Sequence, residues 1–189
     1  MTNSVSILGY FIRPLTVSDV TDDYLKWFDD DEVLRFLEIN KTKNDVSSLK
    51  DLINYVKRFE VSNDYLFGIF DNSKHIGNIT INHIDNDRGT FDMGYLIGNK
   101  DYWGKRAGEA GLVFGLRFAF EDLGLRKIFG GIYSKNLTAR FLSKKIGFVE
   151  EARLKEKGYV DGELDDVIIH TMTREQWKHL YRSKYDFKF

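Results

Sequence analysis

The sequence predicts a mixed α/β fold in which helices flank a central, mostly antiparallel sheet. Two observations support this prediction. Apolar residues recur with the period of a helix in the first third of the chain and change to strand-like runs in the middle. A helix-like run then separates the strand-like residues 90–97 and 127–133, which indicates one parallel crossover among hairpins.

The composition is that of one globular domain over residues 1–189, with 42% hydrophobic and 30% charged residues. Twenty-eight basic residues nearly balance 29 acidic ones, so the net charge favours neither a nucleic acid nor a membrane as partner. The absence of cysteine excludes disulfides, Cys-ligated metals and a thiol nucleophile. We find no metal-ligand spacing and no apolar run of membrane length, and we expect a cytoplasmic protein.

The first strand is expected at residues 11–13, directly before a helical segment. Thr16 stands three residues before Asp19, a spacing typical of a capping box. The apolar residues that follow at helical spacing are Val20, Tyr24, Trp27 and Phe28.

Two further helices are expected before the chain turns to strands. Residues 29–32 are all acidic and are expected to form a loop, and residues 33–37 suggest a short helix. Asn44 is the expected cap of the next helix. Its shared apolar face would carry Val46, Leu49, Ile53 and Val56.

The middle of the chain is expected to form consecutive strands. Residues 65–70 and 75–84 are two strand-like runs joined by a turn at residues 71–73. A second turn at residues 85–89 leads into the strand at residues 90–97. These runs predict a meander.

The last third alternates helices and strands. A helix is expected from about Leu112 to Leu123, and after the strand at residues 127–133 another helix follows Asn136 and ends near Gly147. Two late strands come next, with Asp161-Gly162 as a tight hairpin turn between them.

Residues 102–110, with the sequence YWGKRAGEA, lie between a predicted strand and a predicted helix. A glycine-containing loop there directs backbone N–H groups and the helix dipole at a ligand, which is an arrangement that binds phosphate. Lys105 and Arg106 add two cations at the rim. The pattern is neither a P-loop nor a dinucleotide fingerprint, and in isolation it is a weak indication.

The order of elements and two motifs resemble the GNAT superfamily of acetyl-CoA-dependent N-acetyltransferases. The family's loop pattern, Gln/Arg-x-x-Gly-x-Gly/Ala, is similar to residues 103–108. Its second motif, Asn-x-x-Ser/Ala followed by a Leu and a Gly-Phe, resembles residues 136–148. Residues 118–125 and 173–177 look like the branch of ribosomal-protein N-terminal, aminosugar and polyamine acetyltransferases.

The resemblance implies acetyl-CoA as cofactor and assigns the residues that would bind it. The strand end would offer backbone groups to the pantetheine arm and an oxyanion donor to the thioester, and Asn136 would bond the cofactor arm, cap its helix, or both. The loop would hold the diphosphate mainly through backbone N–H groups. The implied cofactor-binding residues are Tyr95, Leu96, Ile97, Trp103, Gly104, Lys105, Arg106, Ala107, Gly108, Glu109 and Asn136.

Two residues are candidates for proton transfer. Strand alternation places Asp92 on the face opposite Phe91, Met93 and Tyr95, and the resemblance implies an acidic base there. The family often has a tyrosine as general acid near the end of the later helix, where this chain has Ser143. A second departure is Arg106, which occupies the first glycine position of the loop pattern.

The predicted activity is direct transfer of an acetyl group to the primary amine of a small molecule, either an aminosugar or a polyamine-like compound. The alternatives are a protein N-terminal acetyltransferase of the ribosomal-protein type and a CoA-binding module without catalysis. Edge strands in this family often pair, which leaves a homodimer open. The four histidines are expected to be ordinary surface or sheet residues without obvious partners, and the three tryptophans to be packing anchors.

Overall fold

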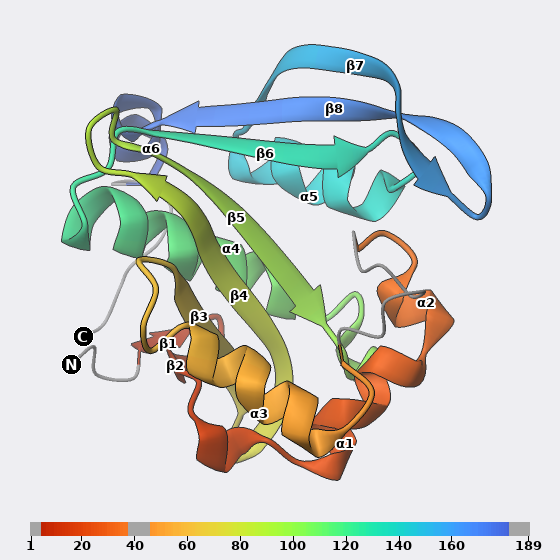
Figure 1. The fold of residues 1–189 in the computed structure, drawn as a ribbon. Coiled ribbons are helices and arrows are strands. Elements are labelled where there is room, and N and C mark those ends of the chain that lie inside the picture. The colour runs from red at the N-terminus through yellow and green to blue at the C-terminus, as the bar shows by residue number, and fades with distance from the viewer. Residues whose placement is uncertain (1–4, 38–45, 182–189) are drawn as a thin grey trace. The chain divides into compact units, whose positions relative to one another are not determined.

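The computed structural model describes residues 5–37 and 46–181, whose elements are labelled along the chain in Figure 1. The contacts within the chain define two compact units. Of the described residues, 5–37, 46–80 and 95–112 belong to the first unit, and 81–94 and 113–181 belong to the second. None of the described helices is long and apolar enough to span a membrane.

The described strands form an eight-stranded, mostly antiparallel sheet, as the sequence predicts. In the first unit the order is β1-β2-β3-β4-β5, and in the second it is β4-β5-β6-β8-β7, because β4 and β5 belong in part to each unit. The strands are β1 Val5–Ile7, β2 Tyr10–Pro14, β3 Tyr65–Asp71, β4 Lys74–Asp85, β5 Thr90–Ile97, β6 Lys127–Tyr133, β7 Val149–Val160 and β8 Glu163–Thr173.

In the first unit, β1 and β2 form a hairpin whose register pairs Ile7 with Tyr10. Its turn residues, Leu8 and Gly9, have φ of 53° and 88°, the left-handed values that two-residue hairpin turns require. The sequence predicts only the second of these strands, at residues 11–13, and misses β1. The core then continues into β3, where Ile12 pairs with Ile69 and both are fully buried.

Short helices follow β2: α1 Asp22–Leu25 and α2 Asp31–Leu34. The acidic run is therefore not a loop throughout. Asp30 is the N-cap of α2, and its Oδ1 accepts hydrogen bonds from the backbone N–H groups of Glu32 and Val33 at 3.0 and 3.3 Å. The helix begins two residues before the predicted start because carboxylates are favourable in a first turn.

Helix α3, Leu49–Arg58, begins at a different cap from the one predicted. Asn44 lies outside the described residues, and Ser48 caps α3 by accepting a hydrogen bond from Asp51 N at 3.2 Å. The buried face centres on Leu52 and Val56, whereas Leu49 is exposed. The predicted face is therefore correct at Val56 but omits Leu52, which is fully buried, and includes Leu49, which is exposed.

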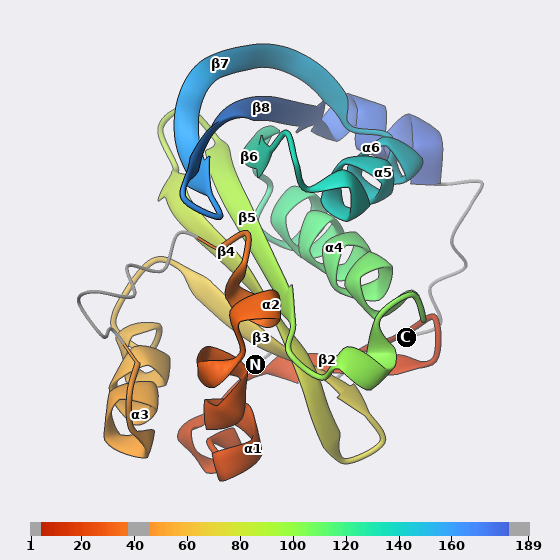
Figure 2. The same cartoon turned by 90° about the vertical axis from the view of Figure 1, so that its right-hand side faces the viewer.

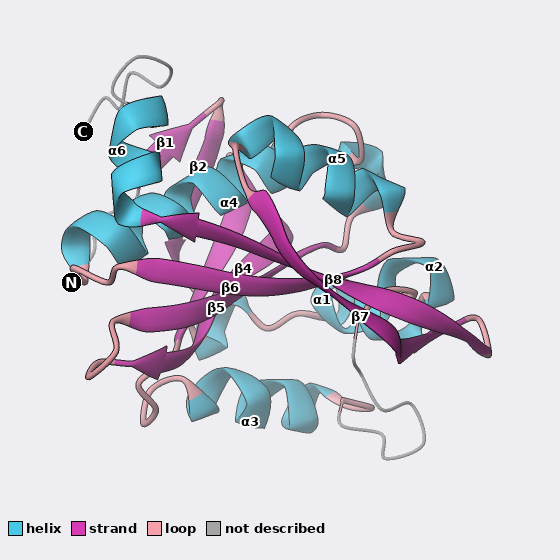
Figure 3. Ribbon diagram, turned by 90° about the horizontal axis from the view of Figure 1, so that it is seen from above, coloured by secondary structure: helices cyan, strands magenta, loops and turns pink. Residues whose placement is uncertain are grey.

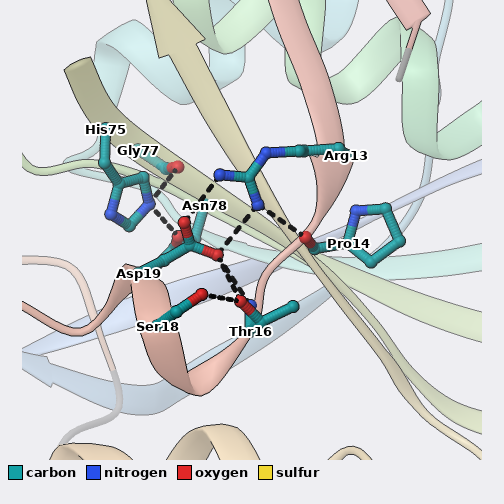
Figure 4. A network of polar contacts seen from close by, with 8 residues as sticks. All are labelled: Arg13, Pro14, Thr16, Ser18, Asp19, His75, Gly77 and Asn78. Atoms are coloured by element: carbon teal, nitrogen blue, oxygen red, sulfur yellow. Dashed lines mark hydrogen bonds and ion pairs between the residues drawn. The ribbon is translucent and has the colours of Figure 1, made fainter. Parts of the chain in front are cut away.

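A polar network fastens β2 to the segment before α1 (Figure 4). Asp19 accepts hydrogen bonds from Arg13 at 2.6 and 2.8 Å, and from both the backbone N–H and the hydroxyl of Thr16 at 2.9 Å. The bond from the backbone of Thr16 is the return half of the predicted capping box. Nearby, His75 Nε2 contacts Gly77 O at 3.0 Å and Asn78 Oδ1 at 2.8 Å, so this histidine has partners that the sequence does not reveal.

In the second unit, β5 and β6 form the parallel pair that the crossover predicts, with Phe91 opposite Ile128. Strands β6, β8 and β7 then lie side by side in antiparallel order, as Figure 3 shows. The turn between β7 and β8 contains Asp161 and Gly162, with φ of 54° and 80°, which confirms the predicted hairpin.

Three helices complete the structure. Helix α4, Ala107–Arg117, starts at the loop and continues as a π-helical turn to Asp122. Helix α5, Leu137–Ile146, ends at Gly147, whose φ of 107° favours glycine. Helix α6, Arg174–Tyr181, follows β8 and contacts the C-terminal end of α5, where the Tyr181 hydroxyl donates to Ile146 O at 3.1 Å (Figure 2 shows both helices). It buries Trp177, the packing anchor that the sequence predicts.

Candidate active site

The glycine-containing loop lies between the end of β5 and the start of α4, and it belongs to the first unit. Gly104 and Arg106 both have left-handed backbones, with φ of 73° and 66°. The first hydrogen bond of α4 runs from Ala110 N to Arg106 O at 3.0 Å. The N–H groups of Ala107 and Gly108 precede that bond and lack partners four residues back, so they are oriented toward the helix N-terminus. This is a fitting cradle for a diphosphate.

Three side-chain hydrogen bonds fasten the loop to its own unit. Tyr10 donates to Lys105 O at 2.8 Å, and Tyr102 donates to the Asp71 carboxylate at 2.8 Å. Trp103 Nε1 donates to Ile97 O at 2.8 Å. Because these bonds hold the loop from β2, β3 and β5, its backbone is positioned before any ligand binds.

Trp103 is not the packing anchor that the sequence suggests. Its side chain is partly exposed, with a relative accessibility of 40%, and its indole N–H satisfies the carbonyl of Ile97. That bond occupies one acceptor position of the strand end where the resemblance places the pantetheine arm. It also fixes where β5 stops and the loop begins.

The end of β5 is closely packed against β4. A side chain at Gly77 would meet Leu96 O at 2.5 Å, and one at Gly98 would meet the Trp27 ring at 1.9 Å. The N–H groups of Gly98 and Asn99 both donate to Ile76 O, at 3.1 and 3.2 Å. The glycines thus permit a close backbone approach that larger residues would prevent.

The Arg106 guanidinium forms an ion pair with a neighbouring side chain. It donates to the Glu109 carboxylate at 2.9 and 3.0 Å, and the Glu109 side chain is only 2% exposed. The cationic rim that the sequence suggests therefore lies mainly with Lys105, whose Nζ is 5.6 Å from the Tyr102 ring centroid. The backbone N–H groups at the start of α4 are therefore the main donors that this loop offers to an anion.

Asp92 lies on β5 in the second unit, and its side chain is 42% exposed. Phe91 beside it is buried and packs edge-on against Phe120 at 5.4 Å, so the two neighbours face opposite sides of the strand as alternation predicts. His83 Nδ1 lies 3.8 Å from Asp92 Oδ2. His83 has a φ of 51°, an irregularity in β4 beside the candidate base.

Asn136 precedes α5 as its cap and Ser143 lies in its last turn, both in the second unit. Asn136 Oδ1 accepts from Ala139 N at 3.0 Å, which shows that Asn136 caps the helix. Ser143 is buried, and its Oγ lies 2.6 Å from His170 Nδ1 on β8. The prediction that His170 lacks a partner is therefore wrong.

The sequence misses several residues of this arrangement because they are distant along the chain. Tyr10 and Asp71 meet the loop across gaps of 95 and 31 residues, and neither belongs to a motif. His170 occurs in a strand that alternates like its neighbours. The one available signal was at Arg106, where the pattern expects glycine and the backbone is indeed left-handed.

Comparisons with known proteins agree with this arrangement of fold and loop. Residues 10–149 match the family model of the acetyltransferase (GNAT) domain. The chain therefore belongs to the GNAT family. It is an acetyl-CoA-dependent N-acetyltransferase.

One relative and two solved structures illustrate the family. The SPbeta prophage-derived uncharacterized N-acetyltransferase YokL of Bacillus subtilis (strain 168) is 26% identical over 166 residues, covering 87% of this chain and 92% of that protein. A spermidine N-acetyltransferase from Vibrio cholerae, in complex with CoA and spermine, superposes with a TM-score of 0.80 at 19% identity, covering 90% and 98% of the two chains. A ribosomal-protein-S5-alanine acetyltransferase from Vibrio fischeri has a TM-score of 0.80 at 17% identity, covering 93% and 99%.

Acetyl-CoA supplies a thioester whose acyl carbon an amine can attack. For that step the amine must lose a proton, and a carboxylate can accept this proton directly or through water. The loop of the first unit fits a diphosphate through its backbone. The polar side chains Asp92, Asn136 and Ser143 all lie in the second unit.

Proposed function

We propose that the acceptor is the primary amine of a small cationic molecule, of polyamine or aminosugar type, and that transfer is direct. The observation that carries this proposal is the charge of residues 22–32, which include six carboxylates and one lysine. Asp22, Asp23, Asp29, Asp31 and Glu32 are all exposed. Such a surface attracts cations from solution and raises their local concentration.

Lys100 organises part of this acidic segment. Its Nζ lies 2.6 Å from the Asp30 carboxylate and 3.1 Å from the Glu32 carboxylate. Lys100 comes three residues after the end of β5. The interaction ties α2 to the connection between β5 and the loop within the first unit. Lys26, which pairs with Asp23, and Lys100 together do not neutralise six carboxylates, so the segment keeps a net negative charge.

In the proposed reaction Asp92 accepts the proton from the acceptor amine, directly or through water. Ser143 donates to the departing sulfur, and the loop at residues 103–109 holds the diphosphate. A general base of this kind contributes about 10²–10⁴ in rate. The V. cholerae spermidine N-acetyltransferase of the same fold supports the choice of acceptor, whereas the V. fischeri ribosomal-protein acetyltransferase supports the alternative of a protein N-terminus.

The testing experiment measures thiol release from acetyl-CoA with separate acceptor classes: polyamines, aminosugar nucleotides, aminoglycosides, amino acids and short peptides with free N-termini. We expect release with a small cationic amine. Release with peptides alone would establish the protein N-terminal alternative. CoA binding without release from any acceptor would favour the non-catalytic module.

A matched pair of variants tests the acidic segment. Asp29→Asn should raise the KM for a cationic acceptor several-fold at low salt and leave the KM for acetyl-CoA unchanged. Asp87→Asn, in the exposed turn before β5, removes the same charge elsewhere and should change neither constant. An equal effect of both variants would contradict a local role for the acidic segment.

A further inference from the structure

A buried hydrogen-bonded pair joins α5 to β8 in the second unit. Ser143 and His170 are 4% and 7% exposed, and Ser143 Oγ lies 2.6 Å from His170 Nδ1. We propose that His170 is a positioning residue that controls the serine proton, so that Ser143 can donate to the departing thiolate only while His170 is protonated. This inference rests on the proposed function, in which Ser143 donates a proton to the leaving sulfur.

The argument starts from the number of protons. A serine hydroxyl has a single proton, and a neutral imidazole nitrogen without hydrogen can only accept. While His170 is neutral with its hydrogen on Nε2, Ser143 donates its proton to Nδ1. An imidazolium carries hydrogen on both nitrogens, so Nδ1 then donates to Oγ and the serine proton becomes available to another acceptor.

The surroundings of His170 make it a stronger acid than an ordinary histidine. Burial lowers its pKa, and Glu150, its register partner on β7, opposes that effect. Arg140 on α5 and Arg153 on β7 lower the pKa further. On its other side β6 contributes Gly130, which has no titrating group. A serine bonded to such an imidazolium is a far better acid than an isolated hydroxyl.

The proposed step balances as follows. The neutral amine forms a bond to the acyl carbon, the carbon–sulfur bond breaks, and the amine proton passes to Asp92 or water. The departing thiolate takes the proton of Ser143 Oγ, and Oγ takes the Nδ1 proton of His170. His170 becomes neutral and recovers its proton from water before the next cycle. No oxidant or other reactant is needed.

The first test compares kcat of the wild type and of His170→Gln across pH 6 to 9. Above the pKa of His170 the imidazole is neutral and accepts the Ser143 proton, so the wild type loses this general acid and the thiolate leaves unassisted, as in the variant. We therefore expect the ratio of wild-type to variant kcat to be about 10² at pH 6, the lower range for general acid catalysis, and to approach one near pH 9. His179→Gln on the exposed face of α6 is the matched control and should keep the wild-type profile.

A ratio that is constant with pH would overturn the proposal, because a merely structural pair lowers activity at every pH alike. If His170→Gln does not fold, Ser143→Ala removes the other partner with little change in volume and must show the same convergence. A wild type that releases no thiol with any acceptor would instead refute the proposed function.

A second measurement does not depend on turnover. The imidazole resonances of His170 are followed by NMR during titration with CoA and with desulfo-CoA, which differ only at the sulfur. We expect CoA, and not desulfo-CoA, to shift the titration midpoint of His170, and Ser143→Ala to abolish the difference. Identical titrations with the two ligands would overturn the proposal.

Discussion

Arg106 holds the buried carboxylate of Glu109 with two hydrogen bonds while its own backbone is left-handed, at a φ of 66°. Arg106 thus adopts the backbone conformation for which the family pattern has glycine. Its side chain binds Glu109, which lies about one helical turn further along the chain. Glu109 is 2% exposed, and a buried carboxylate without a cation nearby is strongly unfavourable.

The first prediction concerns Arg106→Gly. Glycine removes a backbone cost of about 1–2 kcal/mol, but it also leaves Glu109 buried without its partner, a cost of about 3–5 kcal/mol for a fully buried pair. The Arg106 side chain is 53% exposed, so the second cost is reduced. We expect a net loss of about 1–2 kcal/mol in the free energy of unfolding, measured by urea denaturation.

A double-mutant cycle separates the two effects. Arg106→Gly with Glu109→Gln should be more stable than Arg106→Gly alone, because the amide needs no cation. Acetyl-CoA affinity of the double variant should stay within tenfold of the wild type, since backbone N–H groups hold the diphosphate. A larger loss of affinity would show that the guanidinium itself contacts phosphate.

The second prediction tests Asp92 as the base. Asp92→Asn keeps the size of the side chain and removes its ability to take a proton. We expect kcat to fall about 10²–10⁴-fold, while the acetyl-CoA dissociation constant measured by calorimetry changes less than twofold. His83→Gln removes the neighbour at 3.8 Å and should have a smaller effect. Full activity of Asp92→Asn would remove Asp92 from the mechanism.

The third prediction concerns the hydrogen bond from Tyr10 to the loop. Tyr10→Phe leaves Lys105 O without this donor, at a cost of about 0.5–1.5 kcal/mol. Because the bond holds the loop in place before binding, we expect the KM for acetyl-CoA to rise several-fold with kcat nearly unchanged. Tyr159→Phe, at a tyrosine that is 66% exposed on β7, is the control. Equal constants in both variants would show that the loop needs no such support.

After residue 65 the sequence predicts the strands and α5 well because their signals are local, but it begins α4 about five residues late and omits α6. The β-hairpin at Asp161-Gly162, the cap Asn136 and the helix end at Gly147 all depend on residues that are adjacent in sequence. Before residue 65 the structure uses very short helices, whose few residues show little periodicity. The helical start at Asp31 was missed for this reason, whereas the ten-residue α3 was predicted and only its cap, Ser48, was missed.

The candidate site also contains parts that depend on adjacent residues and parts that depend on residues distant in sequence. The loop at residues 103–108 is a continuous motif, and the sequence alone locates it. Two of the three hydrogen bonds that hold the loop, and the pairing of Ser143 with His170, join residues that are 27 to 95 positions apart. Such contacts depend on strand order and register, which a single sequence reveals only through a family resemblance.

The fourth prediction follows from the network around Asp19. Burial alone would raise the pKa of this carboxyl, but hydrogen bonds from Arg13 and Thr16 outweigh burial and lower the pKa from 3.8 to about 2. A carboxyl with a lowered pKa in the folded state stabilises it fully above the unfolded pKa, and this contribution is lost as the pH falls toward 2. We expect Asp19→Asn to be less stable than the wild type at pH 6 and the two proteins to converge between pH 4 and pH 2, as measured by urea midpoints.

Asp23→Asn is the matched control, because Asp23 is exposed and pairs only with its neighbour Lys26 in the described contacts. A difference between wild type and Asp19→Asn that persists unchanged at pH 2 would show that the network acts through packing rather than through the ionised carboxylate.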